Sequence, residues 1–312
     1  MFRKSIVAAA VLIGVATSSQ AADAITFDYN GAAAGGLIVG ATTFDWQPGT
    51  AVAFGGNPSG GLQVGDIVTV RYQANLGTIT DGSNILFANG TGGNYFTAVA
   101  TFQEVVTSVG ANGSATFDLA GAGGTFQIYY NTSGPGNNLT GEGFLAGTAI
   151  LTGNVTDVVS GNFTIASTTP VLLDQFQGDS LGGQLTVTGS GASDLAIMAL
   201  LASVNTSFFV DLFAGTNIAL SFFNTSLVVP YQQVDPSMCL LDPNPAAGCQ
   251  GFDPNLGTVN GALQNTGTDL DFQFQADANQ SFQRNVVPEP GSMALAGLAL
   301  FALGWTARRR AK

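Results

Sequence analysis

The segment Val68-Thr69-Val70-Arg71-Tyr72-Gln73-Ala74 alternates apolar and polar residues without a break. The segment Leu270-Asp271-Phe272-Gln273-Phe274-Gln275-Ala276 repeats the pattern, with Phe and Gln at alternate positions. Successive side chains of a β-strand point to opposite faces, so this period of two predicts strands with one buried and one solvated face. Both segments therefore favour an antiparallel sheet over helices.

Shorter segments of the same kind recur along the chain. They are separated by clusters of Gly, Asn and Ser, such as Asn89–Gly93 and Ser133–Asn137, which favour tight turns. Further strands are expected at Phe96–Val106, Ala115–Leu119, Thr125–Tyr130, Leu145–Leu151, Asn162–Ala166 and Gly183–Thr188. The pattern predicts an all-β protein, a single large β-sandwich or open barrel with Gly/Asn-rich loops.

The pattern leaves the secondary structure of one segment open, but it predicts the number of domains. Asp194–Val204 is apolar on all sides, so a central strand and a short buried helix both remain open. No linker composition interrupts the chain, so residues 22–286 are expected to form one domain.

The composition narrows the possible functions. The 312 residues include 8 Lys+Arg, 20 Asp+Glu and no His, which excludes a basic surface for nucleic acid and any chemistry that needs histidine. Arg71 and Arg284 are the only cations of the body, whose formal charge is −17. Such a body would repel nucleic acid and attract divalent cations or cationic polymers, although extracellular solubility is the simpler interpretation.

Catalytic motifs are missing from the sequence. Serine nucleophiles would lack a histidine or lysine base, and no Gly-rich phosphate loop occurs. The body holds two glutamates, Glu104 and Glu142, and no pattern pairs them for glycoside hydrolysis. We expect a protein that is not an enzyme and that needs no cofactor.

Calcium and sugar are the remaining ligands to consider. Oxygen ligands for Ca²⁺ crowd one loop, but without the spacing of an EF-hand. They are Asp235, Asp242, Asn244, Asp253 and Asn255. Trp46, Tyr129, Tyr130 and Tyr231 could stack on sugars, although aromatic residues at strand spacing more often belong to a core. A secreted carbohydrate-binding adhesin with a defined sugar site therefore stays as the alternative function.

The only two cysteines, Cys239 and Cys249, lie in a proline-rich stretch. An exported chain meets oxidising conditions, so a disulfide between them is expected. Closing a loop of this length contributes roughly 2–3 kcal/mol to stability in the chain-entropy model. A metal site would need further soft ligands.

The first residues have the features of a secretory signal peptide. Arg3 and Lys4 precede an apolar run over Ile6–Ala16, and Ser19-Gln20-Ala21 supplies the small residues of a cleavage site. Residues 1–21 are expected to be removed after Ala21, with Ala24 as a second possible site.

Residues 287–312 combine three features in a fixed order. Val287-Pro288-Glu289-Pro290 is followed by the apolar run Gly291–Thr306 and then by the basic cluster Arg308-Arg309-Arg310. A helix of this length spans about 24 Å, less than the ~30 Å of a hydrocarbon core. The basic cluster would remain in the cytoplasm, so the segment is better suited to holding the chain during processing than to permanent anchoring.

This combination resembles a PEP-CTERM sorting signal. The resemblance implies recognition by an exosortase, a membrane enzyme of Gram-negative bacteria that make exopolysaccharide, and cleavage near Pro288–Pro290. The body would then pass to the cell surface or extracellular matrix, with membrane contact only through the C-terminal helix before the cut. A plain tail anchor is the alternative interpretation.

The body also resembles the flocculation-associated PEP-CTERM protein family. The similar segments are Ile25-Thr26-Phe27-Asp28, Val70-Arg71-Tyr72, Ser221-Phe222-Phe223-Asn224-Thr225-Ser226 and Val234-Asp235-Pro236-Ser237. This resemblance implies a non-enzymatic protein that associates with exopolysaccharide and promotes flocculation or biofilm.

Overall fold

The computed structural model describes residues 23–32, 34–55, 62–110, 114–137, 142–172, 185–212, 216–225, 258–259, 262–263 and 272–283. These residues form strands and one short 3-10 helix, so the all-β prediction is confirmed. The elements are β1 Ile25–Asp28, β2 Leu37–Ala41, β3 Thr43–Gly55, β4 Ile67–Thr80, β5 Ile85–Ala88, η1 Thr91–Gly93, β6 Tyr95–Val109, β7 Ala115–Asn131, β8 Thr148–Leu172, β9 Leu185–Val204, β10 Asn217–Thr225, β11 Thr258–Val259, β12 Ala262–Leu263 and β13 Phe272–Gln283. Over the described ranges, no helix has the length and apolar character needed to cross a membrane.

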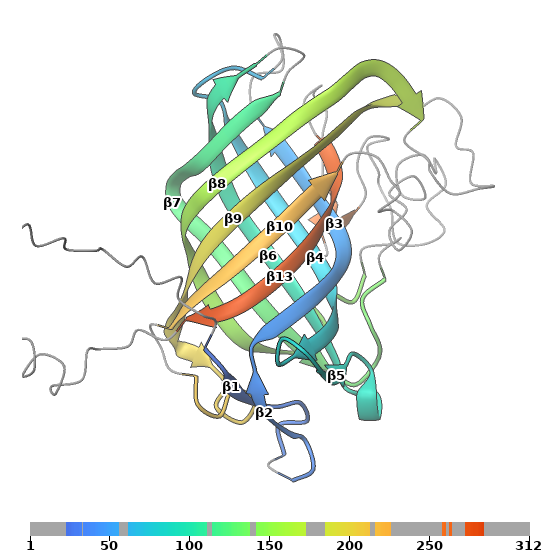
Figure 1. The fold of residues 1–312 in the computed structure, drawn as a ribbon, viewed down its shortest axis with the longest axis vertical. Helices are drawn as coiled ribbons and strands as arrows, with labels where there is room; N and C mark the ends of the chain where they lie inside the picture. The colour runs from blue at the N-terminus through green and yellow to red at the C-terminus, as the bar shows by residue number, and fades with distance from the viewer. Residues whose placement is uncertain are drawn as a thin grey trace, which may run out of the picture.

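One large antiparallel sheet forms the body of the molecule. Its strand order is β3-β13-β10-β9-β8-β7-β6-β4-β5, and β3 also pairs with β4. This last pairing closes eight of the strands into a ring, with the strands running obliquely around it (Figure 1). The architecture is thus a single curled sheet rather than two packed sheets, and β5 extends one margin beside β4.

Several strands are longer than the sequence pattern indicated. The segments expected at Ala115–Leu119 and Thr125–Tyr130 join as β7, and those at Leu145–Leu151 and Asn162–Ala166 fall along β8 or just before it. The glycines between the first two segments lie where the register of β7 shifts, and a Cβ on Gly124 would clash with the Thr101 carbonyl oxygen. Glycine is needed there because two backbones approach closely. A glycine cluster in a sequence is equally typical of a turn, so the pattern alone could not show that the strand continues.

The segment Asp194–Val204 is a strand, which settles the choice that the sequence left open. It forms the second half of β9 and pairs with β8 and β10. Leu195 and Ile197 are buried, whereas Asp194 and Met198 are exposed. The alternation was hidden because Met198 and Ala196 are apolar residues at outward positions.

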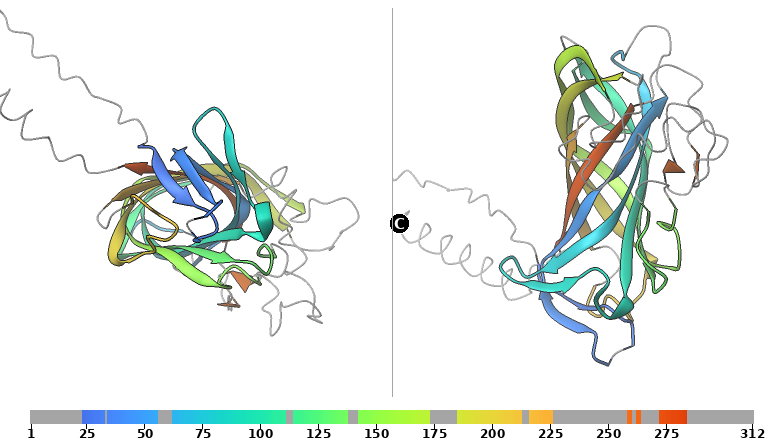
Figure 2. Two further views of the ribbon diagram at one scale, coloured as in Figure 1. Left: turned by 90° about the horizontal axis from the view of Figure 1, so that it is seen from below. Right: turned by 90° about the vertical axis from the view of Figure 1, so that its right-hand side faces the viewer.

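One end of the ring is capped by the hairpin of β1 and β2, which lies across it (Figure 2). Phe27 of β1 forms an isolated bridge with Phe209, and its ring lies 5.0–5.4 Å from the rings of Phe44, Phe96 and Phe209. The backbone N–H of Thr26 donates to Asp211 Oδ1 over 2.8 Å, which ties the hairpin to the segment after β9. This half of the interior is therefore filled by tightly packed aromatic side chains.

Candidate functional site

The half of the ring away from the hairpin contains a cavity of about 310 Å³. Every strand of the ring contributes at least one residue to its lining, so the cavity exists only when the sheet is closed. Most lining residues are apolar, and many are the small side chains of alanine and valine. The aromatic members are Tyr72, Phe102, Phe117, Phe163, Phe222 and Phe274.

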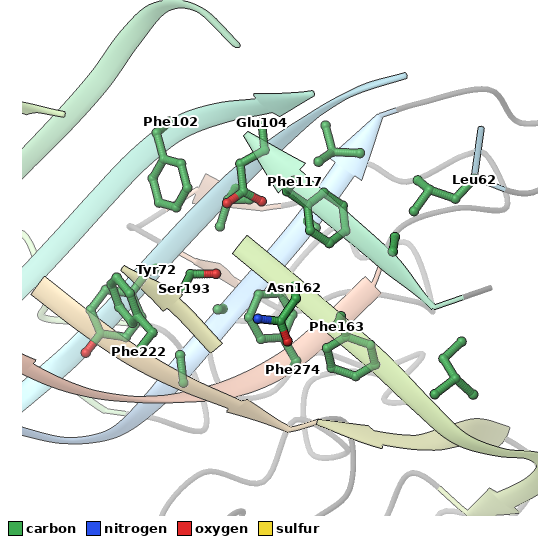
Figure 3. A pocket seen from close by; sticks show the side chains of 17 residues that line it. Leu62, Tyr72, Phe102, Glu104, Phe117, Asn162, Phe163, Ser193, Phe222 and Phe274 are labelled. Carbon is green, nitrogen blue, oxygen red and sulfur yellow. The ribbon is translucent and has the colours of Figure 1, made fainter. Parts of the chain in front are cut away.

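The carboxyl group of Glu104 points into this mostly apolar cavity and lies between Phe102 and Phe117 (Figure 3). On β6, Phe102, Glu104 and Val106 are buried, and Gln103 and Thr107 are exposed. The period of two therefore places Glu104 at an inward position of the strand. An inward glutamate in the alternating segment Phe102–Val106 is the signal in the sequence that could have identified this residue.

Burial changes the chemistry of Glu104. The side chain is 6% exposed, and burial raises the pKa of its carboxyl from 4.5 to about 7 because the charged form loses its hydration. Among the described residues, no hydrogen bond or ion pair to the carboxylate compensates for that loss. The lining contains no Lys or Arg. Glu104 is thus a buried ionisable group that could accept a hydrogen bond from a ligand or pair with a cationic one.

Tyr72 and Phe222 lie at the end of the cavity that borders the packed half (Figure 3). Their rings meet edge to face with centroids 4.7 Å apart. The Tyr72 hydroxyl is buried and has no hydrogen-bond partner among the described residues. Burial, with smaller contributions from Asp277 and Asp45, raises the pKa of Tyr72 well above its usual value.

The arrangement around Glu104 limits what the cavity can do. No second carboxyl group lines it, whereas an acid/base pair for glycoside hydrolysis needs two. Within the part of the chain that the structure describes, no cluster of three or more His, Cys, Asp or Glu residues could hold a metal ion. The cavity has the mostly apolar lining and few polar groups of a small-molecule binding site, the polar members being Glu104, Asn162, Ser193 and the Tyr72 hydroxyl.

The aromatic residues considered for sugar stacking have different positions. Trp46 is fully buried in the packed half, where its Nε1–H donates to Gln280 Oε1 over 3.1 Å. Tyr130 is partly buried, packs on Phe208 with ring centroids 4.7 Å apart, and donates its hydroxyl to Asn94 Oδ1 over 2.7 Å. Tyr129 is partly buried and donates to Gln127 Oε1. Trp46 is therefore a core residue, and Tyr130 lies at the margin of the core.

Asp81 shows the role of an aspartate in a turn. Its side-chain oxygens accept hydrogen bonds from the Asn84 side chain and from the backbone N–H groups of Asn84 and Ser83. These bonds, led by that of the Asn84 side chain, lower the pKa of Asp81. Glu142, the other glutamate of the body, is exposed and lies outside the cavity.

Many residues singled out in the sequence lie outside the described residues. They include the cleavage site at Ala21, the expected disulfide, the candidate calcium ligands, Tyr231 and the C-terminal segment. Their positions in space are therefore not part of the site described above. The members beyond Ala21 and Tyr231 are Asp235, Cys239, Asp242, Asn244, Cys249, Asp253, Asn255, Val287, Pro288, Glu289, Pro290, Arg308, Arg309 and Arg310.

Comparison with protein families identifies the C-terminal segment. Residues 286–310 match the PEP-CTERM protein-sorting motif. Neither the curated proteins nor the solved structures provide a significant match to the chain. The match covers the Pro-Glu-Pro triad, the apolar run and the basic cluster, in agreement with the sequence analysis.

The chain is thus a protein with a closed all-β body and a PEP-CTERM sorting motif. The motif implies processing by an exosortase, and it implies an exported protein held at the cell surface.

Proposed function

We propose that this chain is a non-enzymatic protein of the cell surface or extracellular matrix, which associates with exopolysaccharide after exosortase processing and promotes flocculation or biofilm. The observation that carries the proposal is the sorting motif at residues 286–310, which follows directly on a folded acidic body. The resemblance of the body to flocculation-associated proteins supports the same role.

The outer face of the ring supports contact with a hydrated polymer. On β8 and β9 the exposed positions carry Asn154, Thr156, Ser160 and Asp194, among others. The Ser160 hydroxyl donates to Asp194 Oδ2 over 3.0 Å, and the Thr156 hydroxyl donates to the Ala196 carbonyl oxygen over 3.1 Å. Such short hydroxyl, amide and carboxylate groups can exchange hydrogen bonds with sugar hydroxyls or bind them through water.

The chemistry of the described residues supports a role without catalysis. Glu104 has no partner carboxyl in the cavity, and the chain contains no histidine to activate a hydroxyl nucleophile. A protein built in this way would act by adhesion and scaffolding. Divalent cations could bridge its acidic surface to anionic polysaccharide.

Deletion of the gene tests the role directly. We expect the deletion strain to make polysaccharide but to grow as dispersed cells, and we expect the intact gene to restore flocs. Equal floc formation in the deletion strain would contradict the proposal. Turnover of any polysaccharide by the purified protein would contradict the non-enzymatic assignment.

A matched pair of variants tests the sorting step. Replacing Pro288, Glu289 and Pro290 by alanine should leave the uncut chain in the membrane fraction and abolish flocs. The chain holds a second triad of this form, Pro243-Asn244-Pro245, which lies outside the motif. Alanine at these three positions should leave sorting unchanged, as shown by the intact mass of the exported protein.

A further inference from the structure

We propose that the cavity in the ring binds a small apolar amine, whose ammonium group pairs with the Glu104 carboxylate. The proposal concerns a small-molecule site and does not depend on the role in flocculation. It rests on the size of the cavity, the character of its lining and the position of the single acidic group within it.

The volume of the cavity limits the size of the ligand. At about 310 Å³ it is at the lower end of the roughly 300–1,000 Å³ that ligand sites occupy. A folded oligosaccharide or a whole phospholipid would exceed it. A short alkyl chain or a single ring with one polar group has a suitable size.

The lining determines which part of the ligand is apolar. Phe102, Phe117 and Phe274 come from three different strands, and alanines such as Ala51 and Ala276 leave the space between them. A hydrocarbon group bound in this space would remove apolar surface of both the ligand and the cavity lining from water. Burial of that surface favours binding by about 25 cal/mol for each Å².

The charges around Glu104 determine the polar group of the ligand. The groups that face it across the ring offer no competing charge, because Tyr72 is the only other titratable residue of the lining. Asp118 on β7 and Asp194 on β9 are exposed, whereas Asp277 and Asp45 are partly buried and act on the Tyr72 hydroxyl without lining the cavity. Arg71, the one cation of the described residues, alternates with the inward Val70 and Tyr72 and is not part of the lining.

An amine is the ligand that this environment favours. A carboxylate ligand would meet a second carboxylate with no cation to separate them. A neutral alcohol could donate its hydroxyl to ionised Glu104 or accept a hydrogen bond from the protonated form, but it would not neutralise the charge. An ammonium group would instead satisfy the ionised form of Glu104, and the surrounding aromatic faces would add cation–π attraction.

The pH dependence separates an amine from a neutral ligand. Burial raises the pKa of Glu104 to about 7, so the carboxylate needed for an ion pair becomes populated as the pH rises towards that value. Affinity for an amine should therefore increase about tenfold for each pH unit from about pH 5 to pH 7 and then become constant. Affinity for a neutral alcohol should change much less over the same interval, because its hydroxyl can bond to either form of Glu104.

Calorimetric titration of the protein as recovered from the producing cells tests the inference. The probes are n-octylamine, n-octanol and n-octanoate, which share one chain length and differ in the polar group. We expect one saturable site for n-octylamine with the pH profile given above, and weaker binding of the other two at pH 8. The variant Glu104→Gln should weaken n-octylamine binding at least about thirtyfold at pH 8.

Glu142→Gln is the matched control, because it removes the same charge from an exposed position outside the cavity. It should bind n-octylamine as the unaltered protein does. If Glu104→Gln does not fold, the pH series and the comparison of the three probes on the unaltered protein decide the question. The inference is overturned by the absence of saturable n-octylamine binding, by an affinity that does not change between pH 5 and pH 7, by equal binding of n-octanol or n-octanoate at pH 8, or by unchanged affinity in folded Glu104→Gln.

Discussion

The two halves of the ring are built from the same eight strands, yet they are filled in opposite ways. Near the hairpin, Phe27, Phe44, Phe96, Phe209 and Phe282 pack against one another with ring centroids 5.0–6.2 Å apart. Away from it, aromatic rings and alanines surround a cavity with a carboxyl group in it. A separate element, the β1–β2 hairpin, supplies the additional side chains that fill one half. The comparison indicates that one half of the ring provides most of the stability and that the other is available for a ligand.

The largest difference should appear when one phenylalanine is removed from each half. Phe27→Ala removes a ring that contacts four other phenylalanines and should lower the free energy of unfolding by about 3–5 kcal/mol. Phe117→Ala removes a partly buried ring beside the cavity and should cost only about 1–2 kcal/mol. Urea denaturation of both variants measures the difference, and equal losses would contradict the division of the ring into two halves.

The next effect should come from the buried carboxyl of the hollow half. In the folded protein the pKa of Glu104 is raised by burial to about 7, above its usual 4.5, so the unfolded chain releases this proton at lower pH. Glu104 therefore has no effect on stability below about pH 4.5 and destabilises the fold increasingly up to about pH 7. At pH 8, Glu104→Gln should be more stable than the unaltered protein by about 3 kcal/mol.

The comparison of variants at two pH values isolates this effect. At pH 4 the difference between Glu104→Gln and the unaltered protein should be small, because the carboxyl is then protonated in both states. Glu142→Gln serves as the control and should follow the unaltered protein at both pH values. A constant difference between pH 4 and pH 8 would show that burial does not control the ionisation of Glu104.

A third test enlarges two alanines of a single strand. Ala276 and Ala278 are both buried on β13, but Ala276 lines the cavity and Ala278 lies opposite Trp46 in the packed half. Ala278→Leu should cost about 1–3 kcal/mol because the extra atoms have no space. Ala276→Leu should be neutral or stabilising because the side chain fills part of the cavity. Thermal unfolding measures both, and a similar loss in the two variants would contradict the difference in packing.

The smallest expected effect concerns the boundary between the halves. Tyr72→Phe removes a buried hydroxyl that has no hydrogen-bond partner among the described residues. Because an unpaired buried hydroxyl is costly, the variant should gain about 1 kcal/mol in stability. A loss of stability in chemical denaturation would show that the hydroxyl has a partner that the described residues do not provide.

The period-two pattern was sufficient to predict the positions of strands, but it could not predict how the sheet closes into a ring. Val68–Ala74 and Leu270–Ala276 were predicted from alternation, and Val68–Ala74 lies within β4 while residues 272–276 of the second segment begin β13. The ring depends on the pairing of β3 with both β13 and β4, and the first of these joins residues more than 200 positions apart. Local periodicity contains no information about such a pairing, so a sandwich and an open barrel were equally compatible with it.

The same limit applies to the candidate site. The sorting motif was predicted because its triad, apolar run and basic cluster are consecutive in the sequence. The cavity was not, because its lining comes from all eight strands of the ring. Glu104 was noted only as an unpaired glutamate, although its position between Phe102 and Val106 placed it on the buried face of β6.

The position of the last strand determines how the processed molecule would be oriented. β13 ends at Gln283, next to Phe282, whose ring packs with Phe44 and Phe209 behind the hairpin. Only four residues separate Gln283 from Pro288, a reach of at most about 18 Å to the triad. A molecule joined to another partner through this short tether would therefore stand with its hairpin toward the point of attachment and its hollow half turned to the surroundings.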